Sequence, residues 1–325
     1  MDNRHYTIIG MDVSDRKTQV CVMAREGGRT NIATGLGFKV YLANPYRLKV
    51  ITASKTKNDT NDARLLARIA LADPELLHPV KLRGPEHQKM INIHEMRNLL
   101  VKQRSGIIVQ LRAIAKSMGF RLAKGSAAQF HRLDAKSWPK ELRDIAWPMV
   151  KNLAQLAITI RTYEKLIREL AATAAFKGMV DRLMEIHGVG IMVATGFVAT
   201  IGGDVDRFAK PRDVGPWLGL VPKQSQSGDV DRQCHITKAG SPFMRRLLVE
   251  SAQRIMCECM PDTDLKAKGM RMCVRGAKIA KRKAITAVAR SLAVLMVAML
   301  KRPDAPYVPL SERGKRDLLA ARACA

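Results

Sequence analysis

Three aspartates in the first quarter of the chain are the residues best suited to chemistry. Asp59 and Asp62 lie three residues apart at the predicted start of a helix, so their carboxylates share one helical face. Asp12, at the end of a predicted strand, could join them. Carboxylate oxygens are the ligands that Mg²⁺ prefers, and Mg²⁺ held in this way acts on phosphate groups. A simpler interpretation stays open, in which Asp59 caps the helix and Asp62 is a solvated acid of its first turn.

A second candidate group lies in the other half of the chain, where Ser227 precedes Gly228. A serine beside a glycine is expected in a flexible turn, where its hydroxyl can reach a substrate. Most serines in loops are turn formers, and this interpretation also stays open. The sequence therefore offers an acidic set and a distant hydroxyl, which the fold has to position.

The charge balance identifies the class of partner. The chain has 56 Lys and Arg against 29 Asp and Glu, which gives a net charge of +27 over 325 residues. The basic residues are dispersed along the chain, which favours nucleic acid over a membrane surface. Six cysteines without paired spacing indicate the reducing cytoplasm. The longest apolar stretch, 284–300, is broken by Arg290, so no membrane span is predicted.

The elements that carry the acids are predicted to be short strands followed by a helix. Segments 7–11 and 18–23 read as two strands of a hairpin, and 39–43 reads as a third short strand. From Asp59 the apolar residues fall at helical spacing, and Pro74 ends that run. The parallel pairing expected for the first and third strands leaves few residues for their crossover.

Long helices are predicted between residues 85 and 176. A first helix carries apolar residues at spacings of three, four or seven, namely Met90, Ile93, Met96, Leu100, Ile107, Leu111, Ile114 and Met118. A break is predicted at 119–148, followed by a second helix at 149–175. The pair is either an oligomerisation arm or a hairpin packed within one subunit, because both give the same pattern.

Gly188 and Gly190 stand between two apolar helical turns, in a pattern typical of a helix-hairpin-helix unit. Glycines let a backbone approach a phosphate closely, and the N–H groups at the following helix start can donate to it. A plain corner between two helices is the alternative. His187 beside them is interpreted as structural.

Several segments together resemble one family, the transposases of insertion sequences that combine a DEDD carboxylate domain with a serine. This family includes bridge-RNA-guided recombinases and pilin-gene invertases. The resemblance is carried, in the family's order, by residues 9–14, 42–45, 57–64, 186–194, 219–222, 227–228 and 236–240 with Arg245.

The resemblance implies a fold class and a domain order. It implies an α/β, RNase H-like domain of the resolvase type at residues 1–76, trimmed in its central strand segment. A helical hairpin or coiled coil at 77–176 is expected next, then a mainly α transposase domain at 177–302 with the helix-hairpin-helix unit. Residues 303–325 are expected to form a basic tail.

The resemblance also implies the chemistry. Asp12, Asp59 and Asp62 would bind Mg²⁺, and Ser227 would attack the scissile phosphate to form a phosphoserine-linked DNA intermediate. Ser225 fits the motif less well as the nucleophile. The implied partners are DNA, a guide RNA and further copies of the chain in a dimer or tetramer. The candidate contacts to nucleic acid are Gly188, Gly190, Arg232, Lys238, Arg245 and Arg246.

One departure from the family pattern bears on activity. The region that should carry the family's second acid is missing between Arg29 and Ala33, and Glu26 is the only acid nearby. Two hypotheses follow, an active recombinase with a trimmed metal site and a defective or repurposed derivative that binds nucleic acid without cutting it. A third, a structural DNA- or RNA-binding protein of other ancestry, explains the charge but not the ordered motifs.

Overall fold

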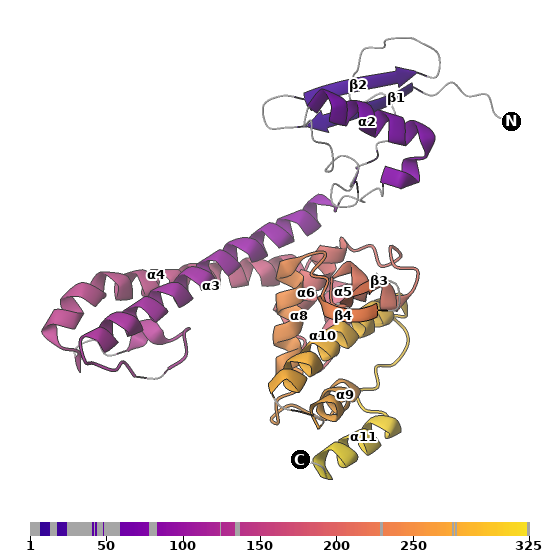
Figure 1. Cartoon of the computed structure of the whole chain (residues 1–325). Helices are drawn as coiled ribbons and strands as arrows, with labels where there is room; N and C mark the ends of the chain where they lie inside the picture. The colour runs from indigo at the N-terminus through magenta and orange to yellow at the C-terminus, as the bar shows by residue number, and fades with distance from the viewer. Residues whose placement is uncertain are drawn as a thin grey trace. The chain divides into compact units, whose positions relative to one another are not determined.

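A computed structural model of the chain describes residues 7–13, 18–24, 41, 43, 48, 59–77, 83–123, 125–133, 137–227, 230–274, 276 and 278–323. The chain divides into two compact units, residues 1–82 and residues 83–325. Most described residues are helical, and the strands form two small two-stranded sheets (Figure 1).

The unit 1–82 is built on a β-hairpin covered by a helix. Strands β1 (Thr7–Val13) and β2 (Thr18–Ala24) pair antiparallel along their whole length. Helix α2 (Asp59–Ala72) packs on both strands (Figure 1). Its alanines Ala63 and Ala67, one turn apart, are buried with 1% and 0% of their surface exposed. Small side chains one turn apart allow a helix to lie close to its neighbours, and the predicted hairpin and helix are both confirmed.

Two details of this unit differ from the sequence prediction. β1 continues through Asp12, which lies inside the strand opposite Gln19 and not beyond the strand's end. Antiparallel pairing with β2 continues to Val13 opposite Thr18, which extends the strand past the apolar run that predicted it. The third strand expected at 39–43 falls mainly outside the described residues, and the two described ones, Tyr41 and Ala43, belong to no strand.

The unit 83–325 is mainly helical. Its elements in chain order are α3 (Pro85–Ser117), η2 (Phe130–Arg132), α4 (Lys140–Ala171), α5 (Lys177–Met184), α6 (Ile191–Ile201), η4 (Pro211–Asp213), α7 (Val214–Trp217), β3 (Pro222–Ser227), β4 (Val230–Ile236), α8 (Pro242–Ile255), α9 (Asp264–Cys273), α10 (Lys278–Lys301) and α11 (Glu312–Ala323).

The main core of this unit forms around α10. Val288, Leu292 and Met296 of α10 are fully buried and belong to the cluster that α5, α6 and α8 also build. Among the described helices, only the stretch Ile279–Lys301 is long and apolar enough to cross a membrane by length and composition, and 44% of it is buried. One face of α10 is fully buried and packs against α8 and α9, as expected for a core helix.

Helices α3 and α4 pack against each other (Figure 1). A second core lies between the C-terminal part of α3 and the N-terminal half of α4. This hairpin core consists of Ile108, Leu111, Ala115, Leu122, Phe130, Trp138, Leu142, Ala146, Val150, Leu153 and Leu156. Nearer the main core, the Arg97 guanidinium on α3 donates to Glu164 on α4 at 2.6 and 3.0 Å. The pair is therefore fixed along its length by apolar packing and an ion pair.

The predicted break at 119–148 is too long, because α4 begins at Lys140 and runs through Pro148. A proline inside a helix removes one hydrogen bond to the carbonyl four residues earlier, here that of Asp144. Leu142 and Ala146, before the proline, are completely buried in the hairpin core. Their packing stabilises the first turns of α4 in spite of the missing bond.

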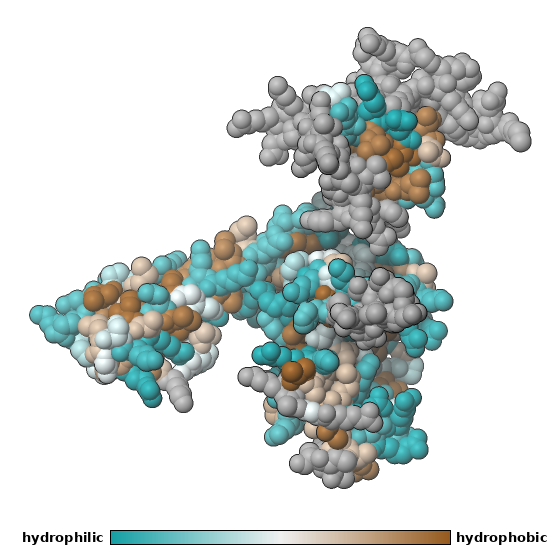
Figure 2. All heavy atoms as spheres, in the orientation of Figure 1, coloured by the Kyte–Doolittle hydropathy of each residue, from teal (hydrophilic) through white to brown (hydrophobic). Residues whose placement is uncertain are grey.

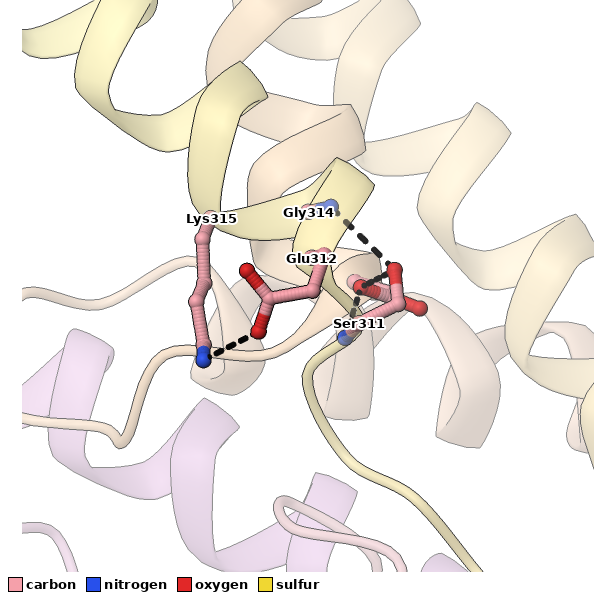
Figure 3. Close-up of polar contacts among 5 residues, drawn as sticks. Ser311, Glu312, Gly314 and Lys315 are labelled. Atoms are coloured by element: carbon pink, nitrogen blue, oxygen red, sulfur yellow. Dashed lines mark hydrogen bonds and ion pairs between the residues drawn. The ribbon is translucent and has the colours of Figure 1, made fainter.

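The segment from residue 303, expected as a basic tail, contains helix α11, which packs on α9. Asp264 at the start of α9 accepts hydrogen bonds from the backbone N–H and the hydroxyl of Ser311, both at 2.9 Å. The Ser311 hydroxyl in turn accepts from the N–H of Gly314, as Figure 3 shows. The Lys315–Glu312 ion pair lies on α11 itself. The two bonds from Ser311 to Asp264 attach the start of the last helix to α9.

His94 of α3 should make this unit sensitive to acid. It is buried, its Nε2 lies 3.0 Å from Thr195 Oγ1 of α6, and its ring is 5.3 Å from Phe243. Burial, with the nearby cation Arg97, lowers the pKa of His94 to about 4. In the unfolded chain His94 takes up a proton near pH 6.5, whereas in the folded chain it stays neutral to lower pH. The folding stability that depends on neutral His94 is therefore fully present above pH 6.5 and is lost as the pH falls toward 4.

We expect His94 to cost unit 83–325 about 2 kcal/mol of unfolding free energy between pH 7 and pH 5. Denaturant unfolding at both pH values, for the wild type and His94→Gln, measures this loss. The variant lacks the titrating group, so its loss over the same range should be smaller by that amount. Equal losses would mean that His94 takes up its proton over the same pH range in the folded and the unfolded chain.

Candidate functional site

The acidic residues lie on neighbouring elements of unit 1–82. Asp59 is the first residue of α2 and Asp62 belongs to its first turn, while Asp12 lies in β1, on which α2 packs. Asp62 is partly exposed, and the side chains of Asp12 and Asp59 lie outside the described ones, as does all of Glu26. Among the side chains that are described, no three of His, Cys, Asp or Glu gather as a metal site. That result does not include Asp12 or Asp59.

Ser227 lies at the end of a strand, where the sequence suggested a flexible turn. It is the last residue of β3 and pairs with Val230 of β4, while Ser225 pairs with Arg232. The hairpin was missed because the segment 222–227 has no alternation of apolar and polar residues, the usual signal of a half-buried strand. Pairing with β4 defines the backbone position of Ser227.

The base of the β3–β4 hairpin is held by two glycines that were not singled out from the sequence. Gly219 and Gly240 both have a left-handed φ, 68° and 71°. A Cβ at Gly219 would lie 2.3 Å from the Ala239 nitrogen, and one at Gly240 would lie 2.2 Å from the Trp217 oxygen. Backbone cannot yield to such contacts, so only glycine fits either position. The sequence marks both positions only through the family segments that contain them, 219–222 for Gly219 and 236–240 for Gly240.

Arg245 of α8, expected to contact phosphate, holds the same base together. Its Nη1 donates to the carbonyl oxygens of Leu218 and Gly240, each at 3.1 Å, and also to that of Ala239. Burial lowers the pKa of Arg245. Because Nη1 of the guanidinium is bonded to backbone carbonyls, its observed role is structural, and a phosphate contact stays a prediction.

The other predicted basic contacts lie around this hairpin. Lys238 is exposed at the end of the motif and has a φ of 56°, unusual for a residue with a side chain. Arg246 lies over the Phe243 ring and 3.5 Å from Glu250. Arg232 is in β4, and its side chain is outside the described ones. The two arginines side by side in sequence thus differ, since Arg245 points into the fold and Arg246 forms an ion pair within its own helix.

The two glycines between α5 and α6 also have different surroundings. Gly188, with a φ of 88°, accepts a hydrogen bond from the Ser251 hydroxyl at 2.6 Å, and its Cβ position is 2.4 Å from Ile255 of α8. Gly190 precedes α6, is exposed and has no atom within 4 Å of a Cβ. Of the two glycines, only Gly190 has open space beside it. The N–H groups of Val193 and Ala194 donate to the Gly190 carbonyl, which leaves those of Ile191 and Met192 at the start of α6 for a ligand.

Two family models match the chain. The model for the transposase IS116/IS110/IS902 family matches residues 180–268, and a DEDD transposase model of the IS110 type matches residues 30–119. Together these segments make up more than half of the chain. The chain belongs to the IS110/IS116 family of transposases. Membership implies DNA transposition with DNA as the substrate, and an RNase H-like fold for the DEDD part.

Individual relatives are also named as transposases. The transposase for insertion sequence element IS1111A of Coxiella burnetii is 26% identical over 92% of this chain and 80% of its own length. A probable family 20 transposase of Pseudomonas aeruginosa is 27% identical over 72% of the chain and 69% of its own. The transposase for element IS1328 of Yersinia enterocolitica is 31% identical over 68% of the chain and 65% of its own.

The contrast between the two glycines leads to a stability prediction. Gly188→Ala combines a left-handed φ with a clash against Ile255 and should lose more than about 2 kcal/mol of unfolding free energy. Gly190→Ala, the matched control two residues away, should lose less than about 1 kcal/mol. Denaturant unfolding of both variants checks this. Similar small losses in both would show that Gly188 does not pack against α8.

Proposed function

We propose that this chain is a DNA recombinase that cuts and rejoins strands through a metal-assisted serine nucleophile. Ser227 is the nucleophile, and Asp12, Asp59 and Asp62 hold Mg²⁺. The observation that carries the proposal is the position of Ser227, at the end of a strand whose base is fixed by Gly219, Gly240 and Arg245. A defined backbone position is what a nucleophile needs.

The residues in the two matched segments support the proposal. The DEDD segment contains Asp59 and Asp62, and the second segment contains Ser227 with the motifs around it. A serine hydroxyl is a poor nucleophile at its own pKa. Without a histidine base, metal coordination is one of the few ways to activate it. The proposal gives each matched segment one half of this chemistry.

The reaction balances without an external energy source. The Ser227 oxygen forms a bond to phosphorus as its proton leaves, and the bond from phosphorus to the sugar oxygen breaks, so that the leaving sugar oxygen takes up a proton and becomes a hydroxyl. Attack of a different sugar hydroxyl on the phosphoserine reverses these changes. Each step exchanges one phosphodiester for another, so the strands rejoin without nucleotide hydrolysis.

The start of α2 has the donors that Mg²⁺ prefers. Asp59 and Asp62 are one helical turn apart, and Asp12 lies in the strand pair that α2 covers. Bound Mg²⁺ supplies charge stabilisation for the phosphate and lowers the pKa of the attacking hydroxyl. The exposed Lys238 and partly exposed Arg246 are suited to neutralise neighbouring phosphates.

The proposal includes two partners beyond the DNA. One is a guide RNA, whose base pairing would select the DNA sites, and the other is further copies of the chain in a dimer or tetramer. The net charge of +27 fits a particle that holds two nucleic acids. The turn from Gly188 to Gly190 would act as a helix-hairpin-helix contact to one of them through the N–H groups at the start of α6.

A second candidate function is a derivative that binds nucleic acid and does not cut it. The DEDD match begins at residue 30, so it leaves out both Asp12 and Glu26. An incomplete acidic set would bind Mg²⁺ weakly, while the basic surface would be unaffected. The two candidates differ in whether a covalent intermediate forms.

Ser227→Ala should abolish a covalent protein–DNA adduct. The wild type is incubated with Mg²⁺ and supercoiled DNA carrying the element ends, and adducts are separated under denaturing conditions and mapped by mass spectrometry. Ser225→Ala, in the same strand, is the matched control and should keep the adduct. Adduct in Ser227→Ala would exclude this nucleophile, and salt-sensitive binding with no adduct in any protein would favour the derivative.

Removal of the metal or of one ligand should have the same effect on the first step. A chelator should eliminate the adduct, and Asp62→Asn should reduce it by on the order of 100-fold at limiting Mg²⁺. Glu75→Gln, an exposed acid of the same unit in η1 (Pro74–Leu77), is the control and should behave as the wild type. Wild-type adduct levels in Asp62→Asn would remove this residue from the metal site.

A further inference from the structure

The first half of α4 borders a groove that has no role in the proposed cleavage and rejoining of DNA. The groove has a volume of about 730 Å³. Its walls come from η2, from the residue after it and from the first half of α4, and are formed by His131, Arg132, Leu133, Arg143, Asp144, Trp147, Pro148, Val150, Lys151 and Ala154. Hydrophobic surface is visible on this part of the α3–α4 pair, among hydrophilic residues (Figure 2).

Trp147 is a large aromatic ring at the edge of this groove. Its side chain is 45% exposed, whereas Trp138, the other tryptophan of the region, is 7% exposed inside the hairpin core. The ammonium of Lys151, one turn later on α4, lies over the Trp147 ring, 5.7 Å from its centre. An exposed indole with a cation over one face can stack a nucleobase on its other face.

The rim of the groove is positive. Arg132, Arg143 and Lys151 line it together with one acid, Asp144, and none of the three cations forms an ion pair with a described carboxylate. Burial, followed by the charges of Arg132, Arg161 and Arg104, lowers the pKa of His131. Cations from α3, η2 and α4 therefore converge near the groove, and a chain of phosphates would neutralise them.

The shape of the groove is held by the hairpin core beneath it. Val150, which lines the groove, is 5% exposed and packs in that core with Leu142 and Leu153. The Arg112 guanidinium lies 5.4 Å from the centre of the Phe130 ring and attaches η2 to α3. The aromatic and basic groups thus stand on a packed support.

We propose that this groove binds an unpaired segment of a nucleic acid strand, with a base stacked on Trp147 and the backbone held by the basic rim. Bases in a duplex stack on one another and do not offer a free face to an aromatic side chain. A second copy of this chain would bring the same positive groups against the rim. Charge and an exposed ring together favour a single strand. The inference is independent of the serine chemistry, because it concerns binding and uses other residues.

The test measures binding of single strands to the full-length protein without divalent metal, so that strand cleavage cannot contribute. Probes are fluorescent oligouridine and oligothymidine of about 12 nucleotides, with a duplex for comparison. Trp147→Ala should weaken single-strand binding about tenfold, and Trp147→Phe, which keeps an aromatic face, should stay within about threefold of the wild type. Ile145→Ala, on the same helix, 57% exposed and outside the groove, is the matched control.

Two further readouts locate the site on a chain with many cations. Probes that carry 5-iodouracil should photocrosslink to the peptide containing Trp147, and Lys151→Gln should reduce the slope of log affinity against log salt by about 0.7. The ribose and deoxyribose probes show which sugar the groove accepts.

Unchanged single-strand affinity in Trp147→Ala, with crosslinks elsewhere, would overturn the proposal. The proposal would also be overturned if Trp147→Ala changed the sedimentation mass of the protein without nucleic acid but left single-strand affinity unchanged. That result would make the groove a contact between copies of the chain.

Discussion

The close backbone approach at the base of the β3–β4 hairpin is the constraint on which the proposed site depends. Gly219 and Gly240 bring the segments 217–219 and 238–240 to within a distance that no side chain would permit. The guanidinium of Arg245 then bonds to carbonyls of both segments. The hairpin leaves the helical body from this junction, so the position of Ser227 is set by backbone contacts many residues away from it.

The same constraint explains why residues of a functional motif can serve the fold. Arg245 and Gly188 both belong to segments typical of the family, and both are occupied by internal contacts, one with carbonyls and the other with Ile255 and Ser251. A sequence motif therefore includes residues that position a functional site as well as residues that contact its ligand. In a chain with 56 basic residues, charge and motif membership do not by themselves identify a phosphate contact.

The sequence predicted the elements that depend on local signals. The β1–β2 hairpin and the helix from Asp59 to the residues before Pro74 follow from apolar spacing and a breaker, and both are present. The start of α4 was misplaced because Pro148 looks like a boundary, and only the packing of Leu142 and Ala146 overrides it. The β3–β4 hairpin has no apolar alternation, so its pairing depends on contacts at its base that no local pattern reveals.

The two cores of unit 83–325 separate two physical tasks. The main core surrounds α10 and supports the junction that positions Ser227, while the hairpin core supports a basic and aromatic surface on α4. Arg97 and Glu164 join α3 and α4 in the stretch between the two cores. Each surface rests on its own packed cluster, and the exposed Trp147 ring belongs to neither core. Trp147→Ala can therefore change the groove without disturbing the junction. Separate supports of this kind let one chain hold a strand in one place and carry a nucleophile in another.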